Sequence, residues 1–321
     1  MRRCFRRHWF LTGVGVAIAV SRWAPWVGAV GGPLHPEITV KAAVGAIFFL
    51  SGLSLQPSQL NRAIRNFKLH ALIQTTSFVL VPLAVMTAPC VALCEGTIAV
   101  ACMPPPVSSA AILTRAAGGN DAAAIFNAAI GSVLGVFVTP LLLLKLVPAA
   151  TAGTTNIAAV LCDLCVSVLC PLAVGQCARP FHARRLPLGT IGQATLLLII
   201  YTTFCDAFAR RESLEPSDLA KTALFLVLLQ IFLMSLVFCL ATRLFSLSPP
   251  DVVCALFSAT HKSLTLGIPI LRVVFSDNLP ALSAPLLIYH PTQILLGGLL
   301  VTSLRSWLLS SPSSPRLINI V

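Results

Sequence analysis

The sequence predicts an all-α membrane protein that crosses the bilayer many times. Of its 321 residues, 57% are hydrophobic and only 10% are charged, whereas an average soluble domain carries about 25% charged residues. The mean hydropathy of +0.90 points the same way. Apolar segments occupy nearly the whole chain, and a spanning helix needs about 20 mostly apolar residues. We therefore expect a polytopic membrane protein with no sizeable soluble domain.

Ten apolar segments are long enough to form membrane spans, and they fall into two sets of five. The first set lies at 11–30, 38–55, 70–87, 96–117 and 122–147. The second set lies at 156–177, 188–208, 220–245, 252–275 and 281–304. The polar link 151–155 separates the two sets. We therefore expect two repeats, residues 1–150 and 151–321, of five helices each.

Local signals mark the ends and contacts of several spans. Arginines precede the first segment, and the Gly-Gly-Pro sequence at 31–33 ends it with a turn. Gly45 and Gly52 in the second segment let helices pack closely. The fifth segment contains Pro140, and the highly charged loop 210–218 separates the seventh segment from the eighth. Lys and Arg are more numerous in the loops that share a side with the termini, which predicts cytoplasmic termini.

The fourth segment is interrupted by three consecutive prolines, Pro104, Pro105 and Pro106, which are followed by Ser108 and Ser109. Proline removes a backbone donor and clashes with the preceding turn, so no helix passes through these residues intact. Within a membrane, broken backbone is tolerated only where it is buried in protein or lines a wet cavity. We therefore expect a half-helix, a break and a second half-helix at a functional site.

The ninth segment is interrupted in a similar way. Its half-helices are expected at 252–259 and 264–275. Its polar residues are Thr260, His261, Lys262, Ser263 and Thr265, and the expected helix breakers Gly267 and Pro269 follow. The two interrupted segments lie in opposite halves of the chain. Paired, interrupted hydrophobic segments are typical of a transport site between inverted repeats. The pattern therefore predicts a secondary transporter.

Lys262 and His261 are the most informative polar residues of the ninth segment. A cation in the hydrocarbon zone costs at least about 2.5–3.5 kcal/mol on insertion scales, which marks Lys262 as a functional candidate. The alternative is that its side chain reaches an interface. His261 either titrates near neutral pH or is a neutral histidine with a hydrogen-bond partner.

Five more polar residues are candidates for contact with a solute or an ion. Ser108 and Ser109 begin a half-helix, whose N-terminus attracts anions, while unwound carbonyls nearby are ligands for Na⁺. The alternative for both serines is capping of that half-helix. Asn127, Gln74 and Gln293 lie on otherwise apolar helices, where hydrogen bonds between helices are the alternative to ligand contact.

Several classes of function are disfavoured. The net charge of +12 is explained by basic cytoplasmic loops, so we expect no nucleic-acid partner. Eleven cysteines spread through apolar segments do not form a disulfide framework or a metal motif. No metalloprotease, serine-hydrolase or P-loop motif occurs. We expect neither an enzyme nor a metal or cofactor site, apart from Na⁺ or H⁺ as a coupling ion.

Several motifs together resemble one family over nearly the full length. They are G-G-P-L-H-P-E-I-T at 31–39, C-M-P-P-P-V-S-S-A at 102–110, S-A-T-H-K-S-L-T-L-G-I-P at 258–269 and P-L-L-I-Y-H-P-T-Q-I-L-L-G at 285–297. The chain resembles the sodium/bile acid cotransporter superfamily, solute carrier family 10. The resemblance implies two inverted five-helix repeats in which helices 4 and 9 are broken and cross. It also implies a core domain (helices 3–5 and 8–10) that moves against a panel domain (helices 1, 2, 6 and 7), carrying organic anions with sodium by alternating access.

The family's sodium ligands match this sequence poorly. A Ser-Asn pair that follows the first break in the family is replaced by Ser108-Ser109-Ala110. A glutamate shared by both sodium sites aligns near Thr260 or His261, so the anionic ligand is missing and Lys262 stands beside the break. A fixed ammonium could occupy a sodium position. We hypothesise that transport is sodium-independent or proton-linked.

A second function stays open at this point. One member of the family is associated with intracellular calcium regulation and the secretory pathway. The alternative to a transporter is therefore a membrane regulator of calcium homeostasis that acts through calcium-signalling membrane proteins. Either function implies a multi-pass protein in the endoplasmic reticulum, the Golgi or the plasma membrane, with lipid around it. A transporter additionally requires a small-molecule solute.

Overall fold

The computed structural model describes residues 2–54, 66–88, 93–106, 109–148, 165–182, 188–209, 215–275 and 279–311. Within these ranges all regular secondary structure is helical and no strand occurs. Six of the described helices or helical stretches are long and apolar enough to cross a membrane. The protein is therefore an all-helical, polytopic membrane protein.

The described helices overlap the predicted spans, although the first part of the predicted sixth span, 156–164, lies outside the described residues. The first half contains α1 (Arg2–Trp23), α2 (Pro25–Gly28), α3 (Pro36–Ser54), α5 (Phe67–Thr75), the π-helix η1 (Thr76–Leu80), α6 (Val81–Thr87), α7 (Cys94–Ala101), α8 (Ser109–Ala116) and α9 (Asp121–Leu146). The second half contains the π-helix η2 (Cys165–Leu169), α12 (Cys170–His182), α13 (Leu188–Ala209), α14 (Pro216–Cys239), the π-helix η3 (Leu240–Leu244), α15 (Pro249–Thr260), α16 (Leu264–Val274) and α17 (Leu279–Ser310). The predicted link 151–155 lies outside the described residues.

The predicted end of the first span is wrong. The span was placed at 11–30, but α1 ends at Trp23 and the short α2 begins at Pro25. Ala24 between them has φ −129° and ψ 60°, outside the helical region. Proline disfavours helical conformation at the residue before it, which accounts for the interruption.

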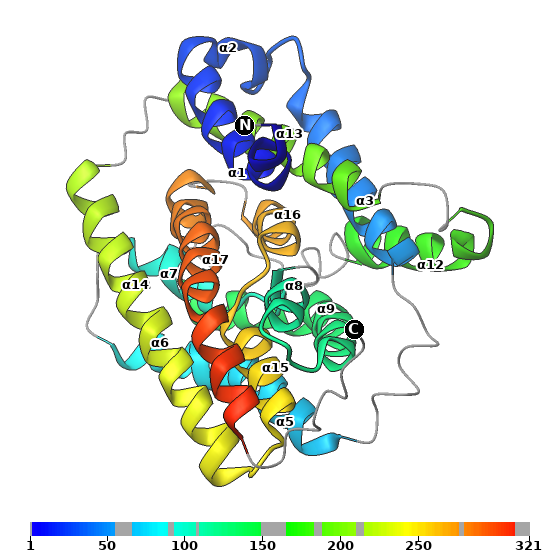
Figure 1. Ribbon diagram of the computed structural model, residues 1–321. Coiled ribbons are helices and arrows are strands. Elements are labelled where there is room, and N and C mark those ends of the chain that lie inside the picture. The colour runs from blue at the N-terminus through cyan, green and yellow to red at the C-terminus, as the bar shows by residue number, and fades with distance from the viewer. Residues whose placement is uncertain are drawn as a thin grey trace.

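The described helices pack as two groups, with α16 between them (Figure 1). One group contains α1, α2, α3, α12 and α13. The other contains α5 to α9 together with α14, α15 and α17. Helix α16 contacts α3 and α13 of the first group and α9 and α17 of the second. Helix α13 also contacts α17 directly, so α16 is one of the elements that join the two groups.

Helices α3 and α12 touch through their main chains. A Cβ atom on Gly52 would lie 2.2 Å from the carbonyl oxygen of Leu172, and one on Gly175 would lie 2.1 Å from that of Phe49. Any larger residue would therefore separate the helices. Small residues at helix contacts are typical of packing in membranes, where close approach of the backbones provides the attraction.

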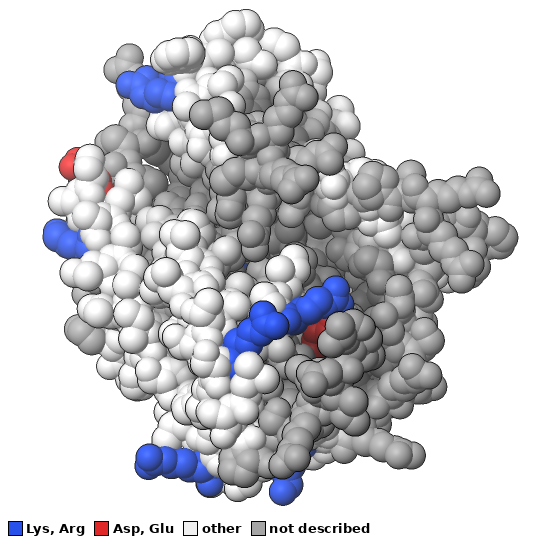
Figure 2. All heavy atoms as spheres, in the orientation of Figure 1, with Lys and Arg blue, Asp and Glu red and all other residues white. Residues whose placement is uncertain are grey.

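Large apolar side chains are exposed on the outer helices. On α14 these are Leu224, Leu228, Ile231 and Phe232, with exposed fractions of 47–62%. Figure 2 shows that the surface over α14 lacks charged residues between its two ends. A soluble monomer rarely exposes so continuous an apolar face. The surface fits a lipid environment.

Candidate functional site

The two predicted interruptions meet inside the protein. Helix α7 ends at Ala101 and α8 begins at Ser109, with the three prolines between them. Helix α15 ends at Thr260 and α16 begins at Leu264. The backbone N–H of Ser263 donates to the carbonyl oxygen of Pro104 at 2.8 Å. The non-helical segments are thus hydrogen-bonded to each other directly, although they lie in opposite halves of the chain.

Two glycines of α9 give the proline segment its space. A Cβ atom on Gly131 would lie 2.8 Å from Pro105, and one on Gly135 would lie 2.5 Å from Pro104. Both distances are shorter than van der Waals contact. One turn further along α9, the Thr139 hydroxyl donates to the carbonyl oxygen of Cys102 at 2.9 Å. Helix α9 therefore holds the first interruption by close packing and by a hydrogen bond.

Lys262 lies at the centre of this arrangement and is fully buried. Its ammonium donates to the carbonyl oxygens of Ala101 at 2.8 Å and Met103 at 2.9 Å. It also donates to the carbonyl oxygen of Ser77 at 2.6 Å and to the Ser77 hydroxyl at 3.1 Å. An ammonium has three donor hydrogens, and all of them are used here. No carboxylate is among these partners, so backbone dipoles stabilise the charge.

Each carbonyl from Ala101 to Pro104 has a donor within the protein. The Lys262 ammonium donates to the carbonyls of Ala101 and Met103. The Thr139 hydroxyl donates to that of Cys102, and the Ser263 N–H donates to that of Pro104. The last carbonyls of a helix have no partner within the helix, and burying them unpaired would be costly. The second interrupted segment therefore supplies the donors for three of these four carbonyls, and α9 supplies the fourth.

Helix α17 satisfies the backbone of the second interruption. The Gln293 side chain accepts from the Lys262 N–H at 2.7 Å and donates to the Lys262 carbonyl oxygen at 2.9 Å. Its Nε2 also lies 3.1 Å from Nδ1 of His290. The Tyr289 hydroxyl donates to the Thr260 carbonyl oxygen at 2.8 Å. A single side-chain amide thus provides a partner for both the backbone N–H and the backbone carbonyl oxygen of Lys262, in place of helical hydrogen bonds.

Gln74 and Asn127 join α5 to α9. Gln74 Nε2 donates to the carbonyl oxygen of Asn127 at 3.1 Å and lies 3.3 Å from its side-chain oxygen. Asn127 Nδ2 donates to the carbonyl oxygen of Ala123 at 2.9 Å. The contacts of Gln74 with Asn127 are hydrogen bonds between helices, the alternative to ligand contact that the sequence left open, whereas the bond from Asn127 to Ala123 lies within α9. They lie beside Gly131, where the Oε1 atom of Gln74 has no partner among the described residues.

The structure separates the remaining predicted residues into two kinds. Ser263 caps α16 by accepting from the Leu266 N–H at 3.3 Å, and its hydroxyl lies 3.2 Å from that of Thr265. The Thr260 hydroxyl donates to the Leu256 carbonyl oxygen at 2.7 Å. Ser108 lies outside the described residues. These hydroxyls on α15 and α16 therefore have structural partners.

Ser109 and His261 differ, because they keep buried polar atoms without partners. Neither ring nitrogen of His261 forms a hydrogen bond with any described residue. The Ser109 hydroxyl forms none either. The His261 ring packs at 69° against Phe257, with ring centroids 5.7 Å apart. A buried polar group without a partner is unfavourable. Like Gln74 Oε1 and the hydroxyls of Thr76 and Thr114, these atoms are open to a hydrogen bond from a water molecule or a solute.

Gly267 and Pro269 were predicted to break the second helix, and this prediction is wrong. Both lie inside α16, and the non-helical residues are His261 to Ser263. Proline is tolerated inside membrane helices where neighbouring groups satisfy the released backbone. Gly267 has a packing role, because a Cβ atom there would lie 2.6 Å from Leu286 and 2.9 Å from Met103.

Four residues of the site were not selected from the sequence. They are Ser77, Thr139, Gln230 and Tyr289; the Tyr289 hydroxyl also donates to the Gln230 side-chain oxygen. All four are polar residues in apolar helices, which is the signal that selected Gln74 and Gln293. Their partners lie in distant segments: Thr139 and Tyr289 donate to backbone carbonyls, Ser77 accepts from the Lys262 ammonium, and Gln230 pairs with side-chain hydroxyls. No local pattern reveals such partners.

Comparison with known proteins gives consistent results. Residues 8–306 match the SBF-like CPA transporter family. Sodium/bile acid cotransporter 7 of Danio rerio is 45% identical, with 94% of this chain and 95% of the relative covered. The protein of the same name in Xenopus tropicalis is 44% identical, with 97% and 96% covered. An uncharacterized protein of Pseudomonas aeruginosa is 30% identical, with 82% and 83% covered. The resemblance inferred from the motifs is confirmed.

Proposed function

The chain belongs to the SBF-like CPA transporter family, and on this basis we propose that it is a secondary active transporter of a small organic anion. Its membership supports a transporter, and the names of the vertebrate relatives point to bile-acid-like organic anions as the class of solute. The two interrupted segments that meet through Ser263 and Pro104 supply a site of the kind found in secondary transporters.

The proposed architecture has ten membrane helices in two inverted repeats, residues 1–150 and 151–321. Helices α5 to α9, α14, α15, α16 and α17 form the proposed core, and α1, α2, α3, α12 and α13 form the proposed panel. The support is that α16 contacts both groups while the interruptions lie within the core. Movement of one group against the other would open the site alternately to each side of the membrane.

The environment of Lys262 supports an unusual form of coupling. Unwound backbone carbonyls and the C-terminal ends of half-helices coordinate Na⁺ in secondary transporters. Here two such carbonyls, of Ala101 and Met103, together with the Ser77 carbonyl of the π-helix η1, surround an ammonium. We propose that Lys262 takes the place of a coupling sodium ion, so that transport is sodium-independent or linked to the proton of this side chain. The set of oxygen contacts around its Nζ is the observation that carries this proposal.

Solute binding is proposed where polar atoms lack partners. Ser109, His261 and the Oε1 atom of Gln74 are the candidates, since these polar side-chain atoms have no partner among the described residues. Gln74, Asn127, Gln293, Thr260, Ser263 and Thr265 hold the surrounding backbone. Residence in the secretory pathway or the plasma membrane, with cytoplasmic termini, belongs to the same proposal.

The test is solute-stimulated charge movement by the purified protein in lipid vesicles, with a panel of organic anions. We expect a signal that is the same in sodium and in choline and that is lost in Lys262→Ala. A sodium-dependent signal that Lys262→Ala leaves unchanged would reject the proposed coupling. Absence of a signal with every anion would reject the transporter and favour the regulatory alternative.

A further inference from the structure

His290 of α17 touches the groups that hold Lys262, but it has had no part in the site so far. It lies three residues before Gln293 on the same face of the helix. Its Nδ1 atom is 3.1 Å from the Nε2 atom of Gln293. The imidazole is half-buried, whereas Gln293 and Lys262 are fully buried. Of these three residues, His290 is therefore the one with an accessible surface.

The orientation of the Gln293 amide is fixed by the backbone of Lys262. Its oxygen accepts from the Lys262 N–H at 2.7 Å, and its nitrogen donates to the Lys262 carbonyl oxygen at 2.9 Å. The second hydrogen of that nitrogen then points to His290, so Nδ1 of the imidazole must be an acceptor. The contact therefore requires a neutral imidazole that carries its proton on the other ring nitrogen.

A second proton on His290 is incompatible with this arrangement. It places an N–H on Nδ1 opposite the N–H of Gln293, and two donors repel. If the amide turned over to accept from the protonated ring, its oxygen would face the Lys262 carbonyl oxygen and its nitrogen would face the Lys262 N–H. One proton therefore removes either the bond between His290 and Gln293 or both bonds between Gln293 and Lys262.

The titratable groups around His290 do not offset this loss. His261 and Lys262 are cations when protonated, and the charge of His261 acts on that of His290. Helix α7 has a carboxylate, Glu95, but the next residue of α7 packs against Pro285, more than one turn before His290. Among the described residues, α1 presents an aromatic ring, and no carboxylate of α8, α13, α14, α15 or α16 interacts with the imidazole. A protonated ring thus gains no described anion as a partner.

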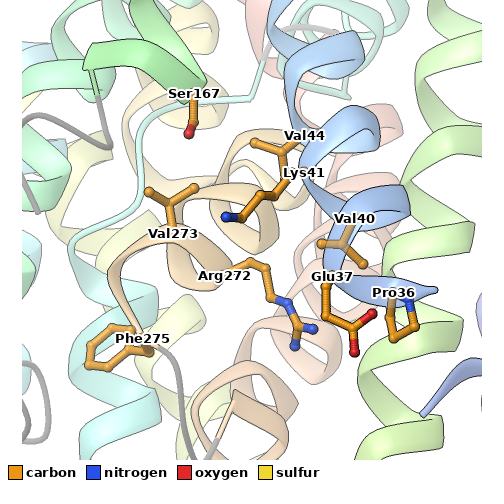
Figure 3. A pocket seen from close by; sticks show the side chains of 9 residues that line it. All are labelled: Pro36, Glu37, Val40, Lys41, Val44, Ser167, Arg272, Val273 and Phe275. Carbon is orange, nitrogen blue, oxygen red and sulfur yellow. The ribbon is translucent and has the colours of Figure 1, made fainter. Parts of the chain in front are cut away.

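His290 also lies where the two groups of helices meet. The ring of Phe10 on α1 packs edge-on against the imidazole, with ring centroids 6.3 Å apart. Helix α1 belongs to the first group and α17 to the second. The groups are not in tight contact throughout, because a cavity of about 370 Å³ lies between the start of α3 and the end of α16 (Figure 3). Movement of one group against the other would change the cover that Phe10 gives the imidazole.

We propose that His290 is a proton-binding, positioning residue for the second interruption. Its neutral form holds the Gln293 amide and, through it, the backbone of Lys262, and its protonated form releases them. Removal of the cover from α1 lets the proton bind, which loosens the segment that carries Lys262. This link to movement of the helices rests on the proposed function, whereas the proton-controlled hydrogen bond does not.

The test is amide hydrogen exchange of the full-length protein in lipid nanodiscs, followed on the peptide that contains Lys262 at about pH 8 and about pH 5, on either side of the histidine titration. His290→Asn does not titrate, and its side-chain oxygen lies near the position of Nδ1. Because exchange itself depends on pH, wild type is compared with His290→Asn at each pH. We expect equal rates at about pH 8 and at least about twofold faster exchange of wild type at about pH 5.

Two further variants check the position of the acceptor. His290→Gln places its amide near the other ring nitrogen, so it should exchange faster than His290→Asn at both pH values. His35→Asn is the matched control, because His35 is exposed between α2 and α3 and has φ 44°, a conformation that asparagine tolerates. It should exchange like wild type. A ratio of wild type to His290→Asn that is the same at both pH values overturns the proposal.

Nitrogen-15 NMR of labelled histidines in wild type provides a measurement that does not depend on folding of the asparagine variant. At about pH 8, the ring whose signals change in Gln293→Leu should carry its proton on Nε2, and a proton on Nδ1 overturns the proposal. Charge movement separates the inference from the proposed function. Transport with the same pH profile in wild type and His290→Asn, together with equal exchange, rejects the role of His290 and keeps the transporter. The expected exchange without any transport keeps the role of His290 and rejects the transporter.

Discussion

The ammonium nitrogen of Lys262 lies 2.6 Å from the carbonyl oxygen of Ser77, a residue 185 positions earlier in the chain. Both residues are fully buried. The contact joins the second interruption to the π-helix η1, and the same ammonium also reaches the end of α7. One side chain thus joins the second interruption, η1 and the end of α7, which share no backbone hydrogen bonds of a common helix.

We expect Lys262→Met to unfold at a lower temperature than wild type, because each buried carbonyl left without a donor costs about 1–3 kcal/mol. Lys262→Ala leaves more space at the same oxygens. In that variant, sodium chloride should restore part of the lost stability, because an ion that binds only the folded state stabilises it. Thermal unfolding of purified protein in sodium or choline chloride measures both effects. Equal unfolding temperatures for wild type and Lys262→Met would contradict this role.

Gln293→Leu should destabilise the second interruption. The substitution leaves the N–H and the carbonyl oxygen of Lys262 without their partners, at about 1–3 kcal/mol for each buried group. Thr292→Val is the matched control, since among the described residues the Thr292 hydroxyl bonds only to the Ile288 carbonyl oxygen of its own helix. Chemical denaturation should show a large loss for the first variant and a small one for the second. The prediction fails if the two variants lose the same stability.

Gly135→Ala should impair transport by displacing α9 from the proline segment. Its Cβ atom would lie 2.5 Å from Pro104, which cannot move aside as a flexible side chain would. Gly298→Ala is the control, because a Cβ atom there meets nothing within 4 Å. Charge movement per folded molecule is the measurement. Wild-type transport by Gly135→Ala would show that this close packing is dispensable.

Asp251 should be the most important described carboxylate for stability. It accepts from the side chains of Asn120 at 2.8 Å, Asn66 at 2.9 Å and Ser248 at 2.7 Å. Hydrogen bonds to charged groups contribute about 1.5–3 kcal/mol each, so Asp251→Ala should lower the free energy of unfolding substantially. Asp218→Ala removes only an exposed pair with Lys221, and such pairs contribute about 0–1 kcal/mol. Comparable losses in the two variants would refute the ranking.

The helices and the place of the first interruption could be predicted because they depend on local chemistry. Three prolines stop a helix wherever it packs, and Pro104 to Pro106 lie between α7 and α8. The partners of Lys262 could not be predicted, since they are main-chain oxygens of segments about 160 and 185 residues away. Nothing in the side chain of Ser77 indicates that its carbonyl oxygen turns toward a cation.

The second interruption lies where the sequence predicts it, between 259 and 264, but the expectation that Gly267 and Pro269 break the helix is wrong for a related reason. Gly267 and Pro269 are common helix breakers, but surrounding packing allows both inside α16. The break occurs at His261 to Ser263, where Gln293, Tyr289 and the proline segment supply alternative hydrogen bonds. Backbone leaves the helix where other segments offer it partners, and that information is not local in the sequence.

The contact between α3 and α12 at Gly52 and Gly175 has a mechanical consequence. Main-chain atoms have no rotamers, so the two helices cannot slide past each other by rearranging side chains. The two helices therefore move as one rigid unit, and relative movement of helices occurs at other contacts. Displacement of the start of α3 therefore displaces α12 as well, so a force on one helix moves both.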